Sequence, residues 1–506
     1  MVEPKAWQVA AGSAAIGLAL AAVAVVAAGP WDSGQRKAER EWAVAQGRAG
    51  GAHHDPSAPR TPAPAPSAAG VLSALAPDTT RSGTTRSGTA HPESAHPEST
   101  RPEAARGTAS PDFGRTLGRL LDADALGPSR TASVVDTATG EVLYGRGAAT
   151  PMTPASTIKI ATTAAALSAL GPGHRIPTIV LATPDRRRLT LVGGGDATLD
   201  RKRLAALAGD TARALRDSGV TKVELRYDTS LYTGPREHPI GPNDNIAPVV
   251  PLMAGQGRLD ASTTGPAPRS GNPAGDAART FASLLHDRGV RTAEPPSAGR
   301  APKGSERLAR TFSAPLSDLV ERALTESDND IAESLARQTA IAAGEPASFA
   351  GAGRAVTAEL ARLRLPLKGT RFADGSGLNR KDKASAALLT ALLTRAADPD
   401  HPELRPVLTG LPVAGFTGTL RSRYGDASPA AGLVRAKTGT LTGVNALAGT
   451  VVDGDGRLLA FAFLAGRTEA PDTAQTALDR LSAALVPPTA PSEPPAPLPA
   501  GESAAP

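Results

Sequence analysis

The sequence predicts an α+β fold, in which an antiparallel sheet packs with helices and carries an inserted, mostly β domain. Two observations indicate this arrangement. Strand patterns lie at both ends of residues 112–486, with helical patterns between them. Across residues 177–312, short strand-like pieces such as LTLVGG and KVELRYD instead alternate with loops rich in glycine and proline. Because sheet segments must pair to bury a common face, we expect residues 112–176 and 313–486 to form one domain around the insert.

The first 31 residues contain an apolar segment without charge, at positions 9–29. Its length is close to the ~20 residues that a bilayer-spanning helix requires, and it exceeds the ~7 to 15 of a signal-peptide core. We therefore expect residues 1–31 to anchor the protein in a membrane. The alternative is a cleaved signal peptide, because the triplet Ala22-Val23-Ala24 resembles a cleavage site.

Two segments have a composition that does not suit a packed core. Residues 32–111 are rich in Pro, Gly, Ser, Thr, Arg and His, and they contain tandem copies of TRSGT and of AHPES. Residues 487–506 are rich in proline and alanine. Such sequences bury too little apolar area to offset the entropy lost on ordering. We expect a disordered linker at 32–111 and a disordered tail at 487–506.

Charge and composition exclude a nucleic-acid partner and any chemistry that needs cysteine. The net charge of +6 and the pI near 9.7 would suit nucleic acid, but aromatic residues make up only 3% of the chain. Because single-stranded nucleic acid is bound largely by aromatic stacking, and the longest basic run covers only residues 186–188, we expect no nucleic-acid partner. The chain has no cysteine, which excludes disulfides and thiolate metal sites.

The predicted elements of the main domain begin with a helix at residues 113–121, where leucines recur at helical spacing. A strand pair joined by a short turn follows at 131–146. The next helix starts near Pro154, since proline suits a first helical turn, and its pattern ends at Gly171. This helix is apolar nearly all round, so we expect it inside the core.

The carboxyl-terminal part predicts three antiparallel strands and a closing helix. The strands are VRAKTGT, NALAGTVVD and RLLAFAFLAG, and a DGDG turn separates the last two. The helix covers residues 472–485. These strands supply the carboxyl-terminal half of the expected sheet.

A serine and a lysine lie three residues apart at the head of the apolar helix, as Ser156 and Lys159. This spacing places both side chains on one helix face. An apolar pocket near a helix amino terminus disfavours a charged amine, so the pKa of Lys159 should fall towards that of a general base. Lys159 could then take the proton of Ser156, whose backbone N–H is available as an oxyanion donor.

A second motif, Ser327-Asp328-Asn329, lies between two helical patterns. Here the hydroxyl of Ser327 can relay a proton to a departing amine, and Asn329 can donate to a substrate carbonyl while holding Lys159. A similar triplet, Ser270-Gly271-Asn272, lies in a glycine- and proline-rich loop with no helix to hold it. We therefore assign the site to residues 327–329.

A third motif, Lys437-Thr438-Gly439 followed by Thr440, lies on a predicted strand. Lys437 supplies positive charge, and the two threonine hydroxyls can bind a substrate carboxylate. Gly439 lets a substrate backbone approach the strand closely. The backbone N–H of Thr440 is the second oxyanion donor that we expect.

Other hydrolase mechanisms lack the necessary residues. Four of the eight histidines lie in the expected linker, and the other four stand in no catalytic motif. The chain contains neither H-E-x-x-H nor G-x-S-x-G. We expect no metal and no cofactor.

In combination and in order, the three motifs resemble those of the class C low-molecular-mass penicillin-binding proteins, the D-alanyl-D-alanine carboxypeptidase/endopeptidase family. The segments LVGGGDATL at 191–199 and DGSGLNR at 374–380 are also similar to family segments. The chain departs from the family at Asn379, where DGSGLSR is usual. The resemblance covers roughly residues 112–486.

The resemblance implies a serine-type D-Ala-D-Ala carboxypeptidase, with DD-endopeptidase activity as a further expectation. It implies catalytic roles for Ser156, Lys159, Ser327, Asn329 and Lys437, and substrate binding by Asp328, Thr438, Gly439 and Thr440. It also implies a fold of the penicillin-binding and β-lactamase type. The expected partners are peptidoglycan stem peptides, β-lactams and, through residues 1–31, the outer face of the cell membrane. The alternatives are a β-lactamase and a non-catalytic receptor for β-lactams or peptides.

Overall fold

The computed structural model describes residues 111–425 and 428–486. The predicted anchor, nearly all of the predicted linker and the predicted tail lie outside these residues. Within the described ranges, none of the helices is both long enough and apolar enough to cross a lipid bilayer.

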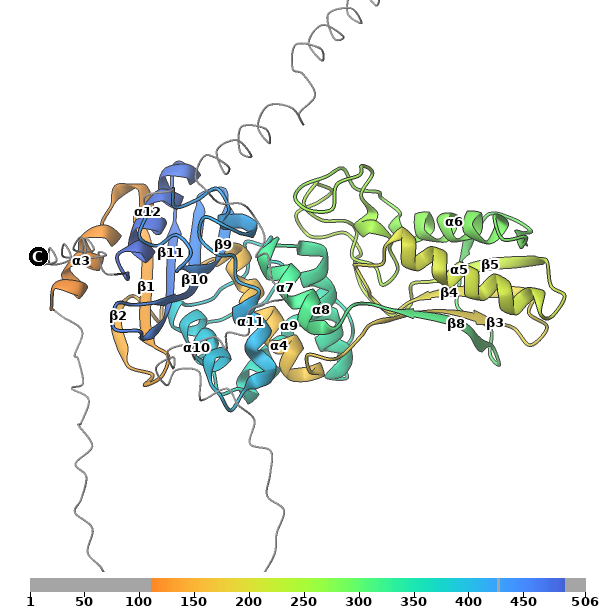
Figure 1. The fold of residues 1–506 in the computed structure, drawn as a ribbon, viewed down its shortest axis with the longest axis horizontal. Coiled ribbons are helices and arrows are strands. Elements are labelled where there is room, and N and C mark those ends of the chain that lie inside the picture. Colours follow the sequence, from red (N-terminus) through yellow and green to blue (C-terminus); the bar gives the residue numbers. More distant parts are fainter. Residues whose placement is uncertain (1–110, 426–427, 487–506) are drawn as a thin grey trace, which may run out of the picture. The chain divides into compact units, whose positions relative to one another are not determined.

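A five-stranded antiparallel sheet forms the centre of the main domain, in the order β2-β1-β11-β10-β9 (Figure 1). Its strands are β1 (Ser129–Asp136), β2 (Val142–Arg146), β9 (Arg435–Leu441), β10 (Val444–Val452) and β11 (Leu458–Gly466). The two ends of the domain meet where β1 pairs with β11, with Ser129 opposite Gly466. The α+β prediction is thus confirmed for the sheet, because the amino-terminal hairpin completes the carboxyl-terminal one.

Both faces of this sheet are covered by helices. On one face, Phe461 and Phe463 of β11 pack in a core with α3 (Pro111–Leu121) and α12 (Pro471–Ala483). On the other face, the alternate residues of β11 join a larger core that includes α10 (Ala386–Ala397). Because successive side chains of a strand point to opposite faces, the unbroken apolar sequence of β11 is what a strand buried on both sides requires.

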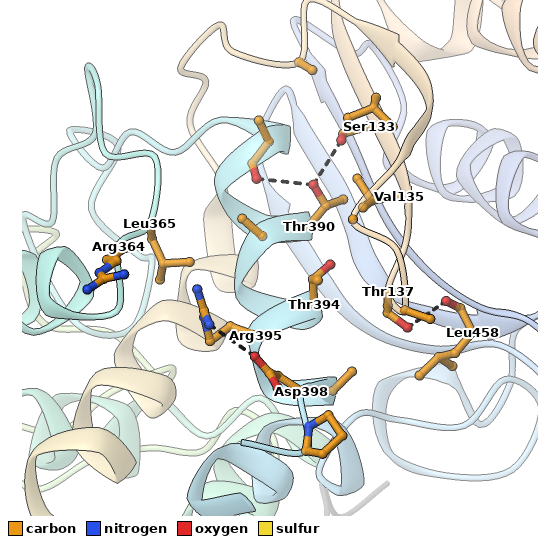
Figure 2. Close-up of a pocket in the computed structure, with 18 residues that line it drawn as sticks. Ser133, Val135, Thr137, Arg364, Leu365, Thr390, Thr394, Arg395, Asp398 and Leu458 are labelled. Atoms are coloured by element: carbon orange, nitrogen blue, oxygen red, sulfur yellow. Dashed lines mark hydrogen bonds and ion pairs between the residues drawn. The ribbon is translucent and has the colours of Figure 1, made fainter. Parts of the chain in front are cut away.

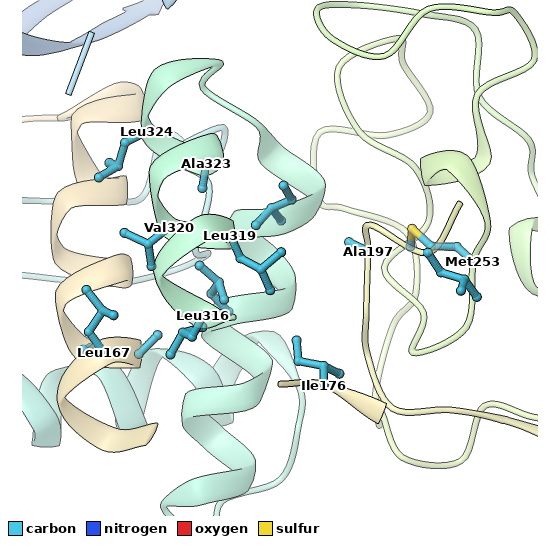
Figure 3. Packing of buried hydrophobic residues seen from close by; sticks show 14 of the residues in the cluster. Leu167, Ile176, Ala197, Met253, Leu316, Leu319, Val320, Ala323 and Leu324 are labelled. Atoms are coloured by element: carbon cyan, nitrogen blue, oxygen red, sulfur yellow. The ribbon is translucent and has the colours of Figure 1, made fainter. Parts of the chain in front are cut away.

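A group of helices packs against α10, on this side of the sheet, and holds the site. It contains α4 (Lys159–Leu170), α7 (Leu316–Thr325), α8 (Asn329–Ala342), α9 (Phe349–Arg362) and α11 (Arg405–Thr409). Figure 3 shows Leu167 of α4 on the side of Leu316 and Val320 of α7. The residues of α4 from Lys159 to Leu167 are all buried, as its all-round apolar sequence predicts.

The insert contains a second sheet, of six strands. Its strands are β3 (Pro177–Ala182), β4 (Arg188–Gly193), β5 (Lys222–Asp228), β6 (Arg291–Thr292), β7 (Ser297–Ala298) and β8 (Glu306–Phe312). The pair β3 and β8 is antiparallel, and it brings Pro177 opposite Phe312. The chain therefore leaves the main domain and returns to it at neighbouring points.

The insert also contains two helices, α5 (Arg201–Arg216) and α6 (Pro273–His286), so the expectation of a mostly β insert was incomplete. Each helix starts at a side-chain cap, because Asp200 accepts from the Arg203 N–H and Asn272 from the Gly275 N–H. These caps were readable in the sequence. Asn272, the last residue of the competing Ser-Gly-Asn triplet, is therefore the N-cap of α6.

Candidate active site

Ser156 lies in a tight turn that the structure holds from two sides. The 3-10 turn Ala155–Ile158 precedes α4, and Ala155 adopts the left-handed region with φ 47°. A Cβ on Gly377 would lie 2.1 Å from the Ala155 carbonyl oxygen, and a Cβ on Gly439 would lie 2.7 Å from the Pro154 carbonyl oxygen. Both glycines are therefore needed for this packing, since real Cβ atoms do not approach so closely. For Gly439 this packing is a second reason beside the predicted one, which was room for a substrate.

Lys159 is fully buried and points at Ser156. Its Nζ lies 3.0 Å from Ser156 Oγ, 2.7 Å from Asn329 Oδ1 and 2.6 Å from the Ser376 carbonyl oxygen. An ammonium has three donors, so these three acceptors use all of them, while a neutral amine keeps two and turns its lone pair to the third partner. Ser156 is the only one of the three that can donate a proton in return.

Burial lowers the pKa of Lys159 from 10.5 to about 8. The negative charges of Asp374, Asp328, Glu333 and Asp382 oppose this effect. A substantial fraction of Lys159 is therefore neutral at mildly alkaline pH, which is the state that can accept a proton.

The Ser327-Asp328-Asn329 turn lies across a cleft of about 270 Å³ from Ser156. Ser327 adopts φ 57°, and its hydroxyl has no hydrogen-bond partner within the described ranges. Asn329 donates from Nδ2 to the Asn245 carbonyl of the insert, at 2.9 Å. Asp328 is already engaged, because its carboxylate accepts from the Ile331 N–H at the start of α8 and from Gln256 Nε2. These two hydrogen bonds show that Asp328 stabilises the turn.

The motif on β9 closes the cleft, with Thr440 and Thr419 in the lining. Lys437 is fully buried, and its Nζ donates to the Thr438 carbonyl at 2.9 Å. Burial, together with the nearby charge of Lys159, lowers the pKa of Lys437 well below its usual range. An anion beside Lys437, such as a substrate carboxylate, would favour its charged form.

A larger cavity, of about 760 Å³, lies away from this cleft, and Figure 2 shows it. It is bounded by Val135 of β1, by Thr390 and Thr394 of α10, and by the Arg364-Leu365 turn. None of the residues predicted for the site lines it. Volume alone therefore does not identify the reactive site.

A sequence model of the D-Ala-D-Ala carboxypeptidase 3 (S13) family matches residues 116–271 and 256–485. The chain belongs to this family. Carboxypeptidase DacB of Mycolicibacterium smegmatis is 39% identical over 397 residues, which cover 74% of this chain and 81% of that protein.

A second sequence relative and a solved structure are also similar to the S13 chain. A D-alanyl-D-alanine carboxypeptidase of an Actinomadura strain is 30% identical over 418 residues, covering 64% of this chain and 75% of that one. The structure of penicillin binding protein 4 from Haemophilus influenzae aligns with a TM-score of 0.62 at 22% identity, covering 72% of this chain and 97% of that one. The fold class and the family resemblance drawn from the sequence are confirmed.

The S13 enzyme has further residues around Lys159 that the motifs did not reveal. The loop at residues 374–377 supplies the Ser376 carbonyl that Lys159 contacts. Glu333 of α8 is fully buried and accepts from the N–H groups of Gly375 and Ser376, at 2.9 and 3.0 Å. The segment DGSGLNR was recognised only by its resemblance to the family. In the sequence, Glu333 carried no signal beyond an acidic residue within a helical pattern.

Asp374 and His238 complete this buried support. Burial alone would raise the pKa of Asp374, but hydrogen bonds from His238 and neighbouring groups lower it to about 2. His238 Nδ1 accepts from the Ile240 N–H, so Nε2 carries the hydrogen and donates to Asp374 Oδ2 at 2.8 Å. His238 belongs to the insert, and the insert therefore holds the loop on which Lys159 depends.

We expect His238→Phe to lower the rate of serine acylation about tenfold, since one hydrogen bond to a charged group is lost. Phenylalanine keeps a ring edge-on to Phe349, whose centroid lies 5.4 Å from that of His238. His238→Gln retains an N–H donor for Asp374 and should recover most of the rate. The measurement is kcat and KM for peptide hydrolysis, with the thermal midpoint as a check on folding. A loss confined to KM, or no recovery in His238→Gln, would argue against a positioning role.

Proposed function

We infer that the protein is a serine-type D-Ala-D-Ala carboxypeptidase that acts on peptidoglycan stem peptides through an acyl-enzyme. One observation carries this conclusion: a fully buried amine with a pKa of about 8 lies 3.0 Å from the hydroxyl of Ser156. Membership of the S13 family supports the same activity. Hydrolysis of cross-links is a second expected activity of the same site.

In the first step, Ser156 Oγ attacks the carbonyl carbon of the terminal peptide bond while Lys159 Nζ accepts its proton. The oxyanion that forms accepts hydrogen bonds from the backbone N–H groups of Ser156 and Thr440. The C–N bond then breaks, and the proton passes through the Ser327 hydroxyl to the amine of the departing D-alanine. A water molecule hydrolyses the acyl-enzyme and restores Ser156.

The remaining motif residues orient the substrate. Lys437 and the hydroxyls of Thr438 and Thr440 bind the terminal carboxylate, which in turn favours the charged form of Lys437. Asn329 binds the amide carbonyl on the acyl side. A β-lactam carries a carboxylate and a strained amide in a similar arrangement, so it should acylate Ser156 as well.

One experiment separates this function from its alternatives. The full chain is incubated with a fluorescent penicillin and with diacetyl-L-Lys-D-Ala-D-Ala, and labelling and D-alanine release are followed. A carboxypeptidase gives both a lasting label and D-alanine. Rapid turnover of the penicillin would instead indicate a β-lactamase, and labelling without peptide cleavage would indicate a receptor.

We expect Ser327→Ala to lower the acylation rate about 100-fold, which is the usual contribution of a proton-transfer group. Ser270→Ala is the matched control, because Ser270 also precedes an asparagine by two positions but bonds to Asp276 and the cap of α6. The second-order rate of penicillin labelling measures both variants. Equal rates for Ser327→Ala and the native enzyme would exclude the proton relay.

The enzyme acts outside the cytoplasm, where its cell-wall substrate lies, and we propose that residues 1–31 tether it to the membrane. Support comes from the uncharged apolar segment at 9–29. The test is fractionation of cells that produce the full chain, with mass analysis of its amino terminus. Recovery of a soluble chain cleaved after position 24 would replace the tether by a signal peptide.

A further inference from the structure

Asp382 is a fully buried acid that the proposed mechanism does not use. It follows the loop at residues 374–377, and its exposed fraction is 0%. Its Oδ1 accepts from the Ala373 N–H at 2.6 Å and from the Asp374 N–H at 3.3 Å. Its Oδ2 receives no hydrogen bond from any donor within residues 111–425 and 428–486. A buried oxygen without a donor is costly when its carboxyl is charged.

The carboxyl of Asp382 also contacts a second carboxyl, that of Asp374. An ionised carboxylate only accepts hydrogen bonds, so two of them repel each other at this range. A hydrogen bond joins the two groups only when one of them carries a proton. The position of that proton follows from the other contacts of the two carboxyls.

Asp374 is held in its ionised form by four donors. These are His238 Nε2, Ser376 Oγ and the N–H groups of Gly377 and Asn379, at 2.6 to 3.1 Å. Hydrogen bonds that are donated to a carboxylate favour its charged form. Asp382 has only two such donors, and both of them bond to one oxygen. The proton therefore lies on Oδ2 of Asp382, which becomes a donor to Asp374.

The electrostatics of the pair agree with this assignment. Burial and the nearby charge of Asp374 raise the pKa of Asp382 to about 10, whereas the pKa of Asp374 is about 2. The other charged and titratable groups around the pair are His238 of the insert, Lys159 of α4, and Glu333 and Arg337 of α8. Of the acids whose charge raises the pKa of Lys159, Asp382 therefore contributes only at strongly alkaline pH, where it ionises.

We propose that Asp382 is a neutral carboxylic acid that donates to Asp374 and so positions the loop whose Ser376 carbonyl holds Lys159. Its Oδ1 accepts from the backbone at the start of this loop, and its Oδ2 donates to the side chain of the same loop. Because it acts through Asp374, it is a positioning residue. The proposal rests on the proposed function only where it makes Lys159 the base.

Two variants distinguish a neutral Asp382 from an ionised one. In Asp382→Asn the amide can accept at Oδ1 and donate from Nδ2 to Asp374, so the rate of penicillin acylation should stay within about twofold of the native rate. In Asp382→Leu the side chain can do neither. There the rate should fall about tenfold, since a hydrogen bond to a charged group is lost.

The pH profile of acylation gives a readout that a purely structural role would not change. If Asp382 is neutral, Asp382→Asn removes no charge, and the rising limb should stay near the native Lys159 pKa of about 8. If Asp382 is ionised, its loss removes a negative charge that raises the pKa of Lys159, and the limb moves to lower pH. Such a shift, or an equal loss of rate in Asp382→Asn and Asp382→Leu, would overturn the proposal.

Stability gives a second readout, because folding must bring a proton to Asp382. In the unfolded chain an aspartate ionises at about pH 4, so between there and pH 10 the folded protein binds one proton more at this residue. The stability of the native protein is lowered by this uptake, increasingly so as pH rises. We therefore expect the thermal midpoint of Asp382→Asn to exceed the native one by about 2 °C or more at pH 8, with a difference that grows with pH. A lower or equal midpoint would contradict the neutral acid.

Asp196→Asn is the matched control. Asp196 is also a buried aspartate, with an exposed fraction of 3%, but its Oδ2 accepts from Arg203 Nη1 at 2.6 Å. This substitution removes the charge that pairs with Arg203, so the thermal midpoint should fall. The rising limb of the acylation profile should not move.

Infrared difference spectra of the native protein and Asp382→Asn detect the proton itself. At neutral pH the native protein should show the carbonyl band of one additional neutral carboxylic acid, and absence of this band from the difference spectrum would refute the proposal. Neither this measurement nor the thermal one needs enzyme activity. A native protein that shows the band but is not labelled by penicillin would therefore count against the proposed function alone.

Discussion

Replacement of Ser156 by alanine is expected to abolish covalent labelling by penicillin and to lower D-alanine release by about 10⁴-fold or more. The reason is geometric. Lys159 Nζ contacts one hydroxyl, that of Ser156, and its other two acceptors are an amide oxygen and a backbone carbonyl. No other side chain in contact with the base can therefore take over the attack.

Gel fluorescence of the labelled full chain and a D-alanine assay measure this effect. Ser133→Ala provides the control, since Ser133 is also a buried serine but bonds to Thr390 Oγ1 at the larger cavity. It should label at the native rate. Persistent labelling of Ser156→Ala at another residue would show that the nucleophile was assigned wrongly.

Replacement of Lys159 by methionine is expected to lower the acylation rate by about 10³ to 10⁴-fold, because the general base is lost and the volume of the side chain is kept. In the native enzyme the rate should rise with pH and level off above about 8. The sign follows from the role of the group: only neutral Lys159 accepts a proton, and its pKa is about 8. Lys159→Met should lose this dependence on pH as well as the rate.

The pH dependence is measured as the second-order rate of penicillin acylation from about pH 6 to pH 10, a range that spans the titration of a base near 8. Lys222→Met, at an exposed position of β5 in the insert, should keep the native profile. A rate that falls through this range, or a Lys159→Met variant that keeps the rising limb, would contradict the assignment of the base.

The contact between Ser156 and Lys159 could be predicted from the sequence because it is local. Ser156 and Lys159 are three residues apart, and any helical turn places such residues side by side. The sheet could also be predicted from the sequence, since its strands carry apolar runs bounded by turn residues. The helices of the insert were missed although Asp200 and Asn272 provide caps, because the glycine- and proline-rich loops around them dominated the pattern.

Contacts between distant segments could not be predicted in this way. The support of Lys159 by Ser376 joins residues 217 positions apart, and that of Asp374 by His238 joins residues 136 apart. The packing of Gly439 against Pro154 was not predicted either, since it depends on how β9 lies against the turn before α4. Each of these contacts depends on how separate elements pack.

By itself, the sequence predicted the nucleophile and its base, fixed the order of the three motifs and identified the family to which the chain belongs. These features depend on neighbours in the chain, whose spacing backbone geometry translates directly into contacts. Only the tertiary structure decided that the loop of Ser376 carries the third acceptor of Lys159 and that Pro154 packs against Gly439. It alone brought His238 of the insert and Asp382 to Asp374, because packing of separate loops brings together side chains that no spacing along the chain relates.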